Sequence, residues 1–128
     1  MRLDFSILGV DKAVAKLKIL EKDVRKDSEK AMYRAATIVE RRAHENISGM
    51  HGHKRHVKTG NLRRNIKSKS KWTGSYDIDG IIGTDVPYAP YVEALPDGGF
   101  LYPALREVGK EALEYFHNQL VKIIKDAI

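Results

Sequence analysis

The 128-residue sequence contains no cysteine, a single tryptophan and four prolines, and it has no long apolar run. The lack of cysteine excludes a disulfide framework, a thiolate metal site and a cysteine nucleophile. No stretch approaches the roughly 18 consecutive apolar residues that a membrane-spanning helix requires, and the apolar run near Met1 is too short for a secretory signal. We therefore expect a soluble chain that has no membrane contact and folds as one domain over residues 1–128.

The net charge of +6 is unevenly distributed along the chain. Residues 41–71 hold ten lysines and arginines and one acidic residue, whereas residues 72–107 hold six acidic residues and one arginine. A basic block of this size is typical of a surface that contacts nucleic acid phosphates. Basic and acidic patches of a chain also meet when they are complementary surfaces of neighbouring copies or partners. Composition leaves both interpretations open.

Hydrophobic periodicity predicts the N-terminal half of the fold. Apolar and polar residues alternate from Arg2 to Leu8, as in a half-buried strand. Apolar residues then recur every three or four positions, which predicts a helix from Asp11 to about Arg25. A second helix, N-capped by Asp27 or Ser28, is expected to run to Ile47 along an alanine-rich apolar line. The pattern leaves open whether the two helices are continuous.

The C-terminal half predicts a hairpin, an aromatic loop and a long helix. Residues 66–71 and 76–82 alternate around a turn, and the lysine-rich first strand is expected at a sheet edge, where lysines discourage further pairing. Four prolines at 87–103 allow only short regular elements there. Beyond Pro103, at a plausible N1 position, the periodicity predicts a helix of about six turns. We therefore predict an α+β fold, with helices packed on one face of a small, mainly antiparallel sheet.

Residues 49–58 form a glycine-containing basic segment without any period, which predicts an exposed, mobile loop. The spacing of its histidines resembles a metal site, but zinc ligands usually come from rigid elements, and neighbouring cations disfavour a divalent ion. We therefore predict no bound metal. Histidines that titrate near neutrality give this loop a means of responding to pH. The loop residues in question are His51, His53, Lys54, Arg55 and His56.

Nothing in the sequence predicts catalysis or a cofactor. Its serines lack the context of an activated nucleophile, and His117 lies beside the apolar stripe of the last helix. Residues 58–61, Lys-Thr-Gly-Asn, differ from a phosphate-binding loop because their glycine follows the lysine. A local explanation fits better: Thr59 or Asn61 caps a short helical turn that ends near Ile66. We expect no catalytic residue, no cofactor and no enzyme.

The basic strand offers a candidate contact surface. Lys67, Lys69 and Lys71 project from one side of a strand, and Arg63 and Arg64 precede them. This density suits phosphate contact, and Trp72 could stack on a base. The other aromatic residues, however, cluster in the acidic half of the chain. A basic DNA-binding module is therefore the alternative hypothesis.

Three segments, in order along the chain, resemble one family. They read KTGNLR at 58–63, VPYAPYVE at 86–93 and PALR at 103–106. Together with the opening strand and Gly9-Val10-Asp11, they resemble the small tail-component proteins of long-tailed phages, the head–tail joining or tail-completion family of siphophages and prophages. One departure is the segment ALPDGG at 94–99, where family members commonly have a short Gly-Thr segment.

The resemblance implies a non-enzymatic virion structural protein of the tail or neck, assembled in the host cytoplasm. Such proteins form a homo-oligomeric ring, typically hexameric, at the head-proximal end of the tail, between tail-tube and head-connector proteins. The basic loop would then line the channel for DNA, contacting it non-specifically, or order on docking. Tyr88 and Tyr91 are equally compatible with core and interface positions. The candidate interface residues are Arg63, Arg64, Lys67, Lys69, Lys71, Tyr88, Tyr91 and Glu93.

Overall fold

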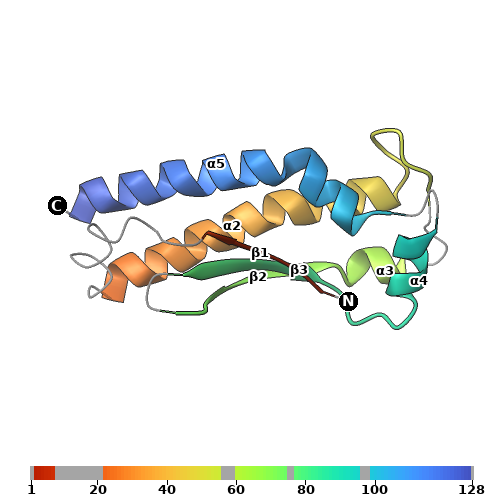
Figure 1. The fold of residues 1–128 in the computed structure, drawn as a ribbon, viewed down its shortest axis with the longest axis horizontal. Helices are drawn as coiled ribbons and strands as arrows, with labels where there is room; N and C mark the ends of the chain where they lie inside the picture. The colour runs from red at the N-terminus through yellow and green to blue at the C-terminus, as the bar shows by residue number, and fades with distance from the viewer. Residues whose placement is uncertain (1, 8–21, 56–59, 75–76, 96–98, 128) are drawn as a thin grey trace.

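The computed structural model describes residues 2–7, 22–55, 60–74, 77–95 and 99–127. The described elements, labelled as in Figure 1, are three strands and four helices. In chain order they are β1 (Arg2–Ile7), α2 (Lys22–Ile47), α3 (Asn61–Arg64), β2 (Lys67–Trp72), β3 (Ile78–Gly83), α4 (Ala89–Ala94) and α5 (Leu101–Ala127).

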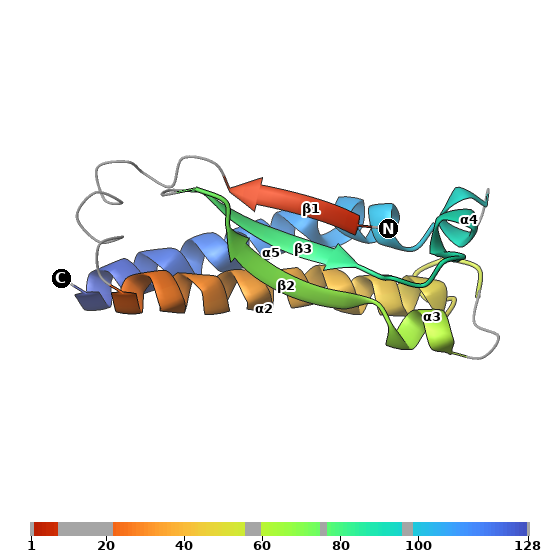
Figure 2. The same cartoon turned by 90° about the horizontal axis from the view of Figure 1, so that it is seen from below.

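The fold has two layers, a sheet and a pair of long helices (Figures 1 and 2). Among the described residues the strand order is β1-β3-β2, and both pairings are antiparallel. Helices α2 and α5 run in opposite directions, side by side, along one face of this sheet. The predicted α+β class, the antiparallel hairpin and the edge position of the lysine strand are therefore confirmed.

The core forms where small side chains of α2 meet α5 and the sheet. Ala35, Ala36 and Ala43 are fully buried, and their short side chains let the neighbouring layers approach the helix closely. The larger buried residues fill the space around them. These are Met32, Val39 and Ile47 of α2, Ile78 and Ile82 of β3, and Leu101 and Phe116 of α5.

Helix α2 differs from the predicted helix at its N-terminal end. It begins at Lys22 and passes without interruption through Asp27 and Ser28, so the predicted cap there is wrong. Ser28 is 1% exposed and continues the buried line between Val24 and Ala31, because a serine is small enough for a helix face that packs closely. Residues 8–21, which carry most of the first predicted helix, lie outside the described residues.

The short helices α3 and α4 flank the hairpin. The helical turn predicted to end near Ile66 is present but ends at Arg64, its N-cap is Gly60, and Asn61 is its first residue. Thr59, the other predicted cap, lies outside the described residues. Gly60 has a φ of +78°, a left-handed conformation that glycine adopts without strain. The proline-rich segment contains α4, which has only six residues, in agreement with the predicted limit on regular structure there.

Helix α5 begins at Leu101, two residues before the predicted start at Pro103. Proline is tolerated there because the first N–H groups of a helix have no partner within it. The Glu93 carboxylate accepts hydrogen bonds from the backbone N–H groups of Phe100 (2.9 Å), Leu101 (2.8 Å) and Tyr102 (3.2 Å). This long-range cap supplies the acceptors that the local sequence lacks.

Phe116 tests the packing of α5 against the core, because its side chain is 1% exposed. We expect Phe116→Ala to lower the free energy of unfolding by about 3–5 kcal/mol, the usual cost of removing a buried aromatic ring. Urea unfolding followed by circular dichroism measures this change. Leu113→Ala is the matched control, because Leu113 is 38% exposed on the same helix; its expected loss is below about 1 kcal/mol. Equal losses for the two variants would contradict this packing.

Candidate functional site

Strand β2 separates its side chains between the two faces of the sheet. Lys67, Lys69 and Lys71 are exposed, whereas the residues between them are half-buried on the helix side. The Ser70 hydroxyl donates to the carbonyl of Glu29 in α2 at 2.7 Å, which fixes that orientation. The structure therefore brings the three predicted lysines together on the sheet face that α2 and α5 leave uncovered (Figure 2). We call these three residues the lysine face.

Trp72 is not part of the lysine face. Its indole N–H donates to the carbonyl of Arg25 at 3.4 Å, and the Arg25 guanidinium lies 4.6 Å from the ring centroid. Both contacts hold the ring against α2, on the side of the sheet opposite the lysines. The suggestion that Trp72 stacks on a base beside these lysines is therefore wrong, because strand alternation separates them.

The two arginines of α3 differ in their exposure and in their neighbours. Arg63 is half-buried, and its Nη1 donates to the hydroxyl of Ser48, just beyond the end of α2, at 3.2 Å. Arg64 is exposed, and its guanidinium lies so close to Gly60 that a Cβ at that glycine would meet Nη1 at 2.9 Å. Arg63 thus serves the fold by joining α3 to the segment that follows α2.

Tyr88 and Tyr91 both lie outside the core. Tyr88 is 44% exposed and Tyr91 75% exposed, and the Tyr88 hydroxyl accepts a 3.3 Å hydrogen bond from Asn61 Nδ2. Leu95, just after α4, and Tyr102, in the first turn of α5, are also about half exposed. The start of α5 and α4 lie at the same end of the molecule (Figure 1). We use the name tyrosine patch for these four exposed side chains of α4 and its flanking segments, Tyr88, Tyr91, Leu95 and Tyr102. The buried residues of the same segments are Val86, Ala89 and Phe100.

Glu93, a predicted interface residue, is engaged within the fold. Besides capping α5, its carboxylate is crowded by the chain, because a Cβ on Gly99 would lie 2.9 Å from Oε2. A glycine at that position lets the backbone approach the carboxylate. Glu93 therefore fixes α4 against the first turn of α5.

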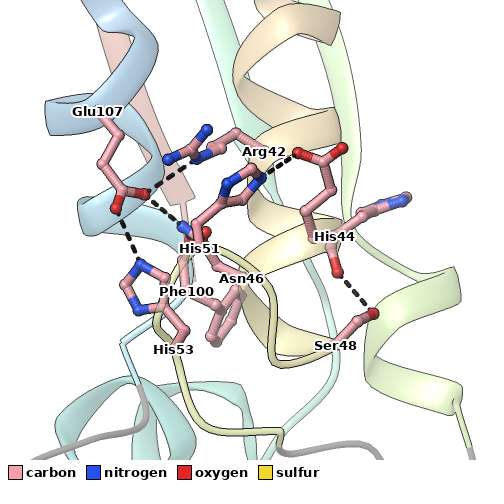
Figure 3. Close-up of polar contacts among 9 residues, drawn as sticks. Arg42, His44, Asn46, Ser48, His51, His53, Phe100 and Glu107 are labelled. Carbon is pink, nitrogen blue, oxygen red and sulfur yellow. Dashed lines mark hydrogen bonds and ion pairs between the residues drawn. The ribbon is translucent and has the colours of Figure 1, made fainter.

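A polar cluster that sequence analysis missed joins the basic loop to both long helices (Figure 3). Its centre is Glu107 of α5, whose side chain is 28% exposed. Glu107 Oε1 accepts from Asn46 Nδ2 at 2.9 Å and from Arg42 Nε at 3.3 Å, and Oε2 lies 2.9 Å from His53 Nε2. The contributing residues are 54 to 65 positions from Glu107 in the sequence, so no local pattern indicates the cluster.

Asn46 is the buried member of this cluster, with 1% of its surface exposed. Its amide also donates to the carbonyl of Phe100 at 3.3 Å, so one side chain connects the end of α2 to the beginning of α5. The Asn46 Oδ1 atom has no hydrogen-bond partner among the described residues. A polar residue at a buried position of the alanine-rich stripe was the one sequence signal for this cluster.

The electrostatic environment of Glu107 favours its ionised form. Partial burial raises the pKa of its carboxyl, but hydrogen bonds from His53, Asn46 and Arg42, together with the charge of His53, outweigh burial and lower the pKa to about 2. Glu107 is therefore an anion at any pH near neutrality, held between Arg42 and Asn46 of α2 and His53 of the loop.

The second histidine contact of the loop lies beside this cluster. His51 Nε2 lies 2.8 Å from Glu45 Oε1 on α2. Within the described ranges no three His, Cys, Asp or Glu side chains are grouped as metal ligands, and His56 lies outside those ranges. None of the helices that the structure describes has the length and apolar character needed to cross a membrane. Mobility of the 49–58 loop stays a prediction.

Comparison with known protein families agrees with the resemblance found in the sequence. Residues 11–94, well over half of the chain, match the family model described as "Bacteriophage HK97-gp10, putative tail-component". The chain therefore belongs to the HK97-gp10-like family of phage tail components, and it is a structural protein of the virion tail. The match spans the lysine face and α4, whereas β1 and α5 lie outside it. No curated protein and no solved structure matches the chain.

The lowered pKa of Glu107 generates a stability prediction. Its interactions stabilise the fold fully above the ordinary carboxyl pKa of 4.5, and this contribution is lost as the pH falls toward about 2. We expect Glu107→Gln to lower the free energy of unfolding by about 1–3 kcal/mol relative to the wild type at pH 6. At pH 2 the difference between the two proteins should be much smaller. Urea unfolding at both pH values measures the difference.

Glu114→Gln provides the control, since Glu114 is exposed on the same helix and its replacement should change stability by less than about 0.5 kcal/mol. A Glu107→Gln protein as stable as the wild type at pH 6 would show that the cluster contributes nothing to the fold.

Proposed function

We propose that this tail component acts in tail completion or head–tail joining, as a closed ring at the head-proximal end of the tail. Six subunits is the number typical of the family that the sequence resembles. Membership of a tail-component family supports a role in assembly, and the exposed tyrosine patch is the observation that carries the proposal. This role is structural and needs no catalytic residue.

The tyrosine patch is suited to a contact between subunits. Tyrosine is enriched in the central, desolvated part of protein interfaces, where its ring contributes apolar area and its hydroxyl a hydrogen bond. Tyr91, at 75% exposure, leaves most of its ring in water in the isolated chain. A patch that occurs once per chain and docks on a different surface of the next copy makes a heterologous contact, which closes into a ring when the rotation permits.

The lysine face is suited to a different role in the ring. Lysine is depleted from interface centres, so Lys67, Lys69 and Lys71 belong at a rim or on a surface open to solvent and DNA. The acidic segment of residues 72–107 in a neighbouring copy also offers these lysines fewer available carboxylates than its composition indicates. Two of its carboxylates, Glu93 and Glu107, already bind groups within the same chain.

Removal of the Tyr91 ring tests the subunit contact. We expect Tyr91→Ala to change the free energy of unfolding by less than about 0.5 kcal/mol, since the ring is exposed, but to prevent ring formation on assembled tail tubes. Negative-stain microscopy and sedimentation of tubes mixed with the protein measure assembly. The control is Tyr33→Ala, a 48% exposed tyrosine on α2. Normal rings from the Tyr91 variant would contradict the proposed contact.

DNA contact through the lysine face is the second candidate function, favoured by three exposed lysines on one face of an edge strand. Neutralising three phosphates predicts an affinity for random duplex that falls about 40-fold between 50 and 200 mM salt. Fluorescence anisotropy measures this change, and replacing the three lysines by glutamine should abolish the salt dependence that they cause. Binding that stays constant across this salt range excludes a phosphate contact.

A further inference from the structure

The basic loop is attached to both long helices through its two described histidines. His51 contacts Glu45 of α2 at 2.8 Å, and His53 contacts Glu107 of α5 at 2.9 Å (Figure 3). The two histidines lie two residues apart in the chain but engage carboxylates on different helices. Together the two contacts therefore tie the loop to both long helices.

The described loop backbone combines left-handed conformations with a few local hydrogen bonds. Gly49, His51 and Gly52 all have positive φ angles, of 90°, 57° and 81°. His51 carries a Cβ, for which this left-handed conformation is less favourable than for glycine, and its contact with Glu45 helps to hold it. The described backbone hydrogen bonds within the loop include those from Met50 N–H to Glu45 O and from His53 N–H to Met50 O.

We propose that His51 and His53 form a pH-dependent latch, which holds residues 49–55 against α2 and α5 when the imidazoles are protonated and releases them when the imidazoles are neutral. The consequence is a change in how the basic segment around Lys54 and Arg55 is presented. This proposal requires nothing of ring formation, so it stands or falls independently of the proposed function.

The charged groups around the two histidines determine which protonation state strengthens the loop contacts. His53 faces the Glu107 carboxylate, which Arg42 and Asn46 of α2 also contact, and His51 faces Glu45. Other basic residues described near the loop include its own Lys54 and Arg55, His44 of α2, whose carbonyl accepts from Ser48, and Arg63 of α3, whose guanidinium contacts Ser48. Arg42 contacts Glu107 independently of the loop, so the carboxylate keeps a cationic partner in both states.

Protonation decides the strength of both histidine contacts. A charged imidazolium makes a shorter and about twofold stronger hydrogen bond to a carboxylate than a neutral ring does. Histidine ordinarily changes charge near pH 6.5, whereas Glu107, with a pKa lowered to about 2, remains an anion throughout. We therefore expect both contacts to be strongest when the imidazoles are charged and to weaken as the pH rises and the imidazoles lose their protons.

Solvent exchange of loop amides, measured by NMR on the full chain between pH 5.5 and 8, tests the latch. We expect the protection factors of the Met50 and His53 amides, corrected for intrinsic exchange, to fall about tenfold over this range. The amide of Val39, in the buried part of α2, should keep its protection throughout. Constant protection of the loop amides in the wild-type chain would overturn the proposal without any variant.

Substitutions identify the residues responsible. The double variant His51→Gln/His53→Gln should show low loop protection at every pH, with the Val39 amide confirming that the core stays folded. His117→Gln is the matched control, because His117 is exposed on α5 ten residues beyond Glu107, about 15 Å along the helix. A double variant that retains the wild-type pH profile would show that other groups control the loop.

Discussion

The alanine side chains on the buried face of α2 let this helix lie close to both α5 and the sheet. Ala35, Ala36 and Ala43 have no exposed surface, and the larger apolar residues of β3 and α5 pack around them. The two long helices cover one face of the sheet, and the three lysines of β2 are exposed on the other. The arrangement also brings the end of α2 beside the start of α5, so that Asn46 can contact Phe100 and Glu107. The lysine face, the loop contacts and the cap of α5 all depend on this packing.

Regular alternation and helical periodicity predicted most of the fold. The strand pattern of residues 66–82 correctly indicated a hairpin with its lysine strand at the sheet edge, because alternation fixes which residues share a face. The predicted start of α5 was wrong, because the carboxylate that caps this helix belongs to Glu93 in another helix. Glu93 lies seven to nine residues before the N–H groups that it accepts from. Ser28 failed as a cap because burial against neighbouring layers outweighed its local preference for a helix terminus.

Sequence located the candidate site only in part. Lys67, Lys69 and Lys71 were found together as predicted, since they belong to one strand. The Glu107 cluster was missed, because it joins residues from three separate segments that only the tertiary fold brings together. The exposure of Tyr88 and Tyr91 also required the structure, since spacing alone was compatible with core and interface positions. Family membership then gives these surfaces a common context, that of a phage tail component.

The central claim is that the tyrosine patch becomes the contact between subunits when the protein assembles. Hydroxyl-radical footprinting of Tyr91, in the free chain and on assembled tails, tests this claim most directly. Because 75% of Tyr91 is exposed in the isolated chain, it should react readily there. The account predicts that this reactivity falls at least about tenfold on the tail, as expected for a ring buried at an interface centre. Equal reactivity of Tyr91 in the two states would contradict it.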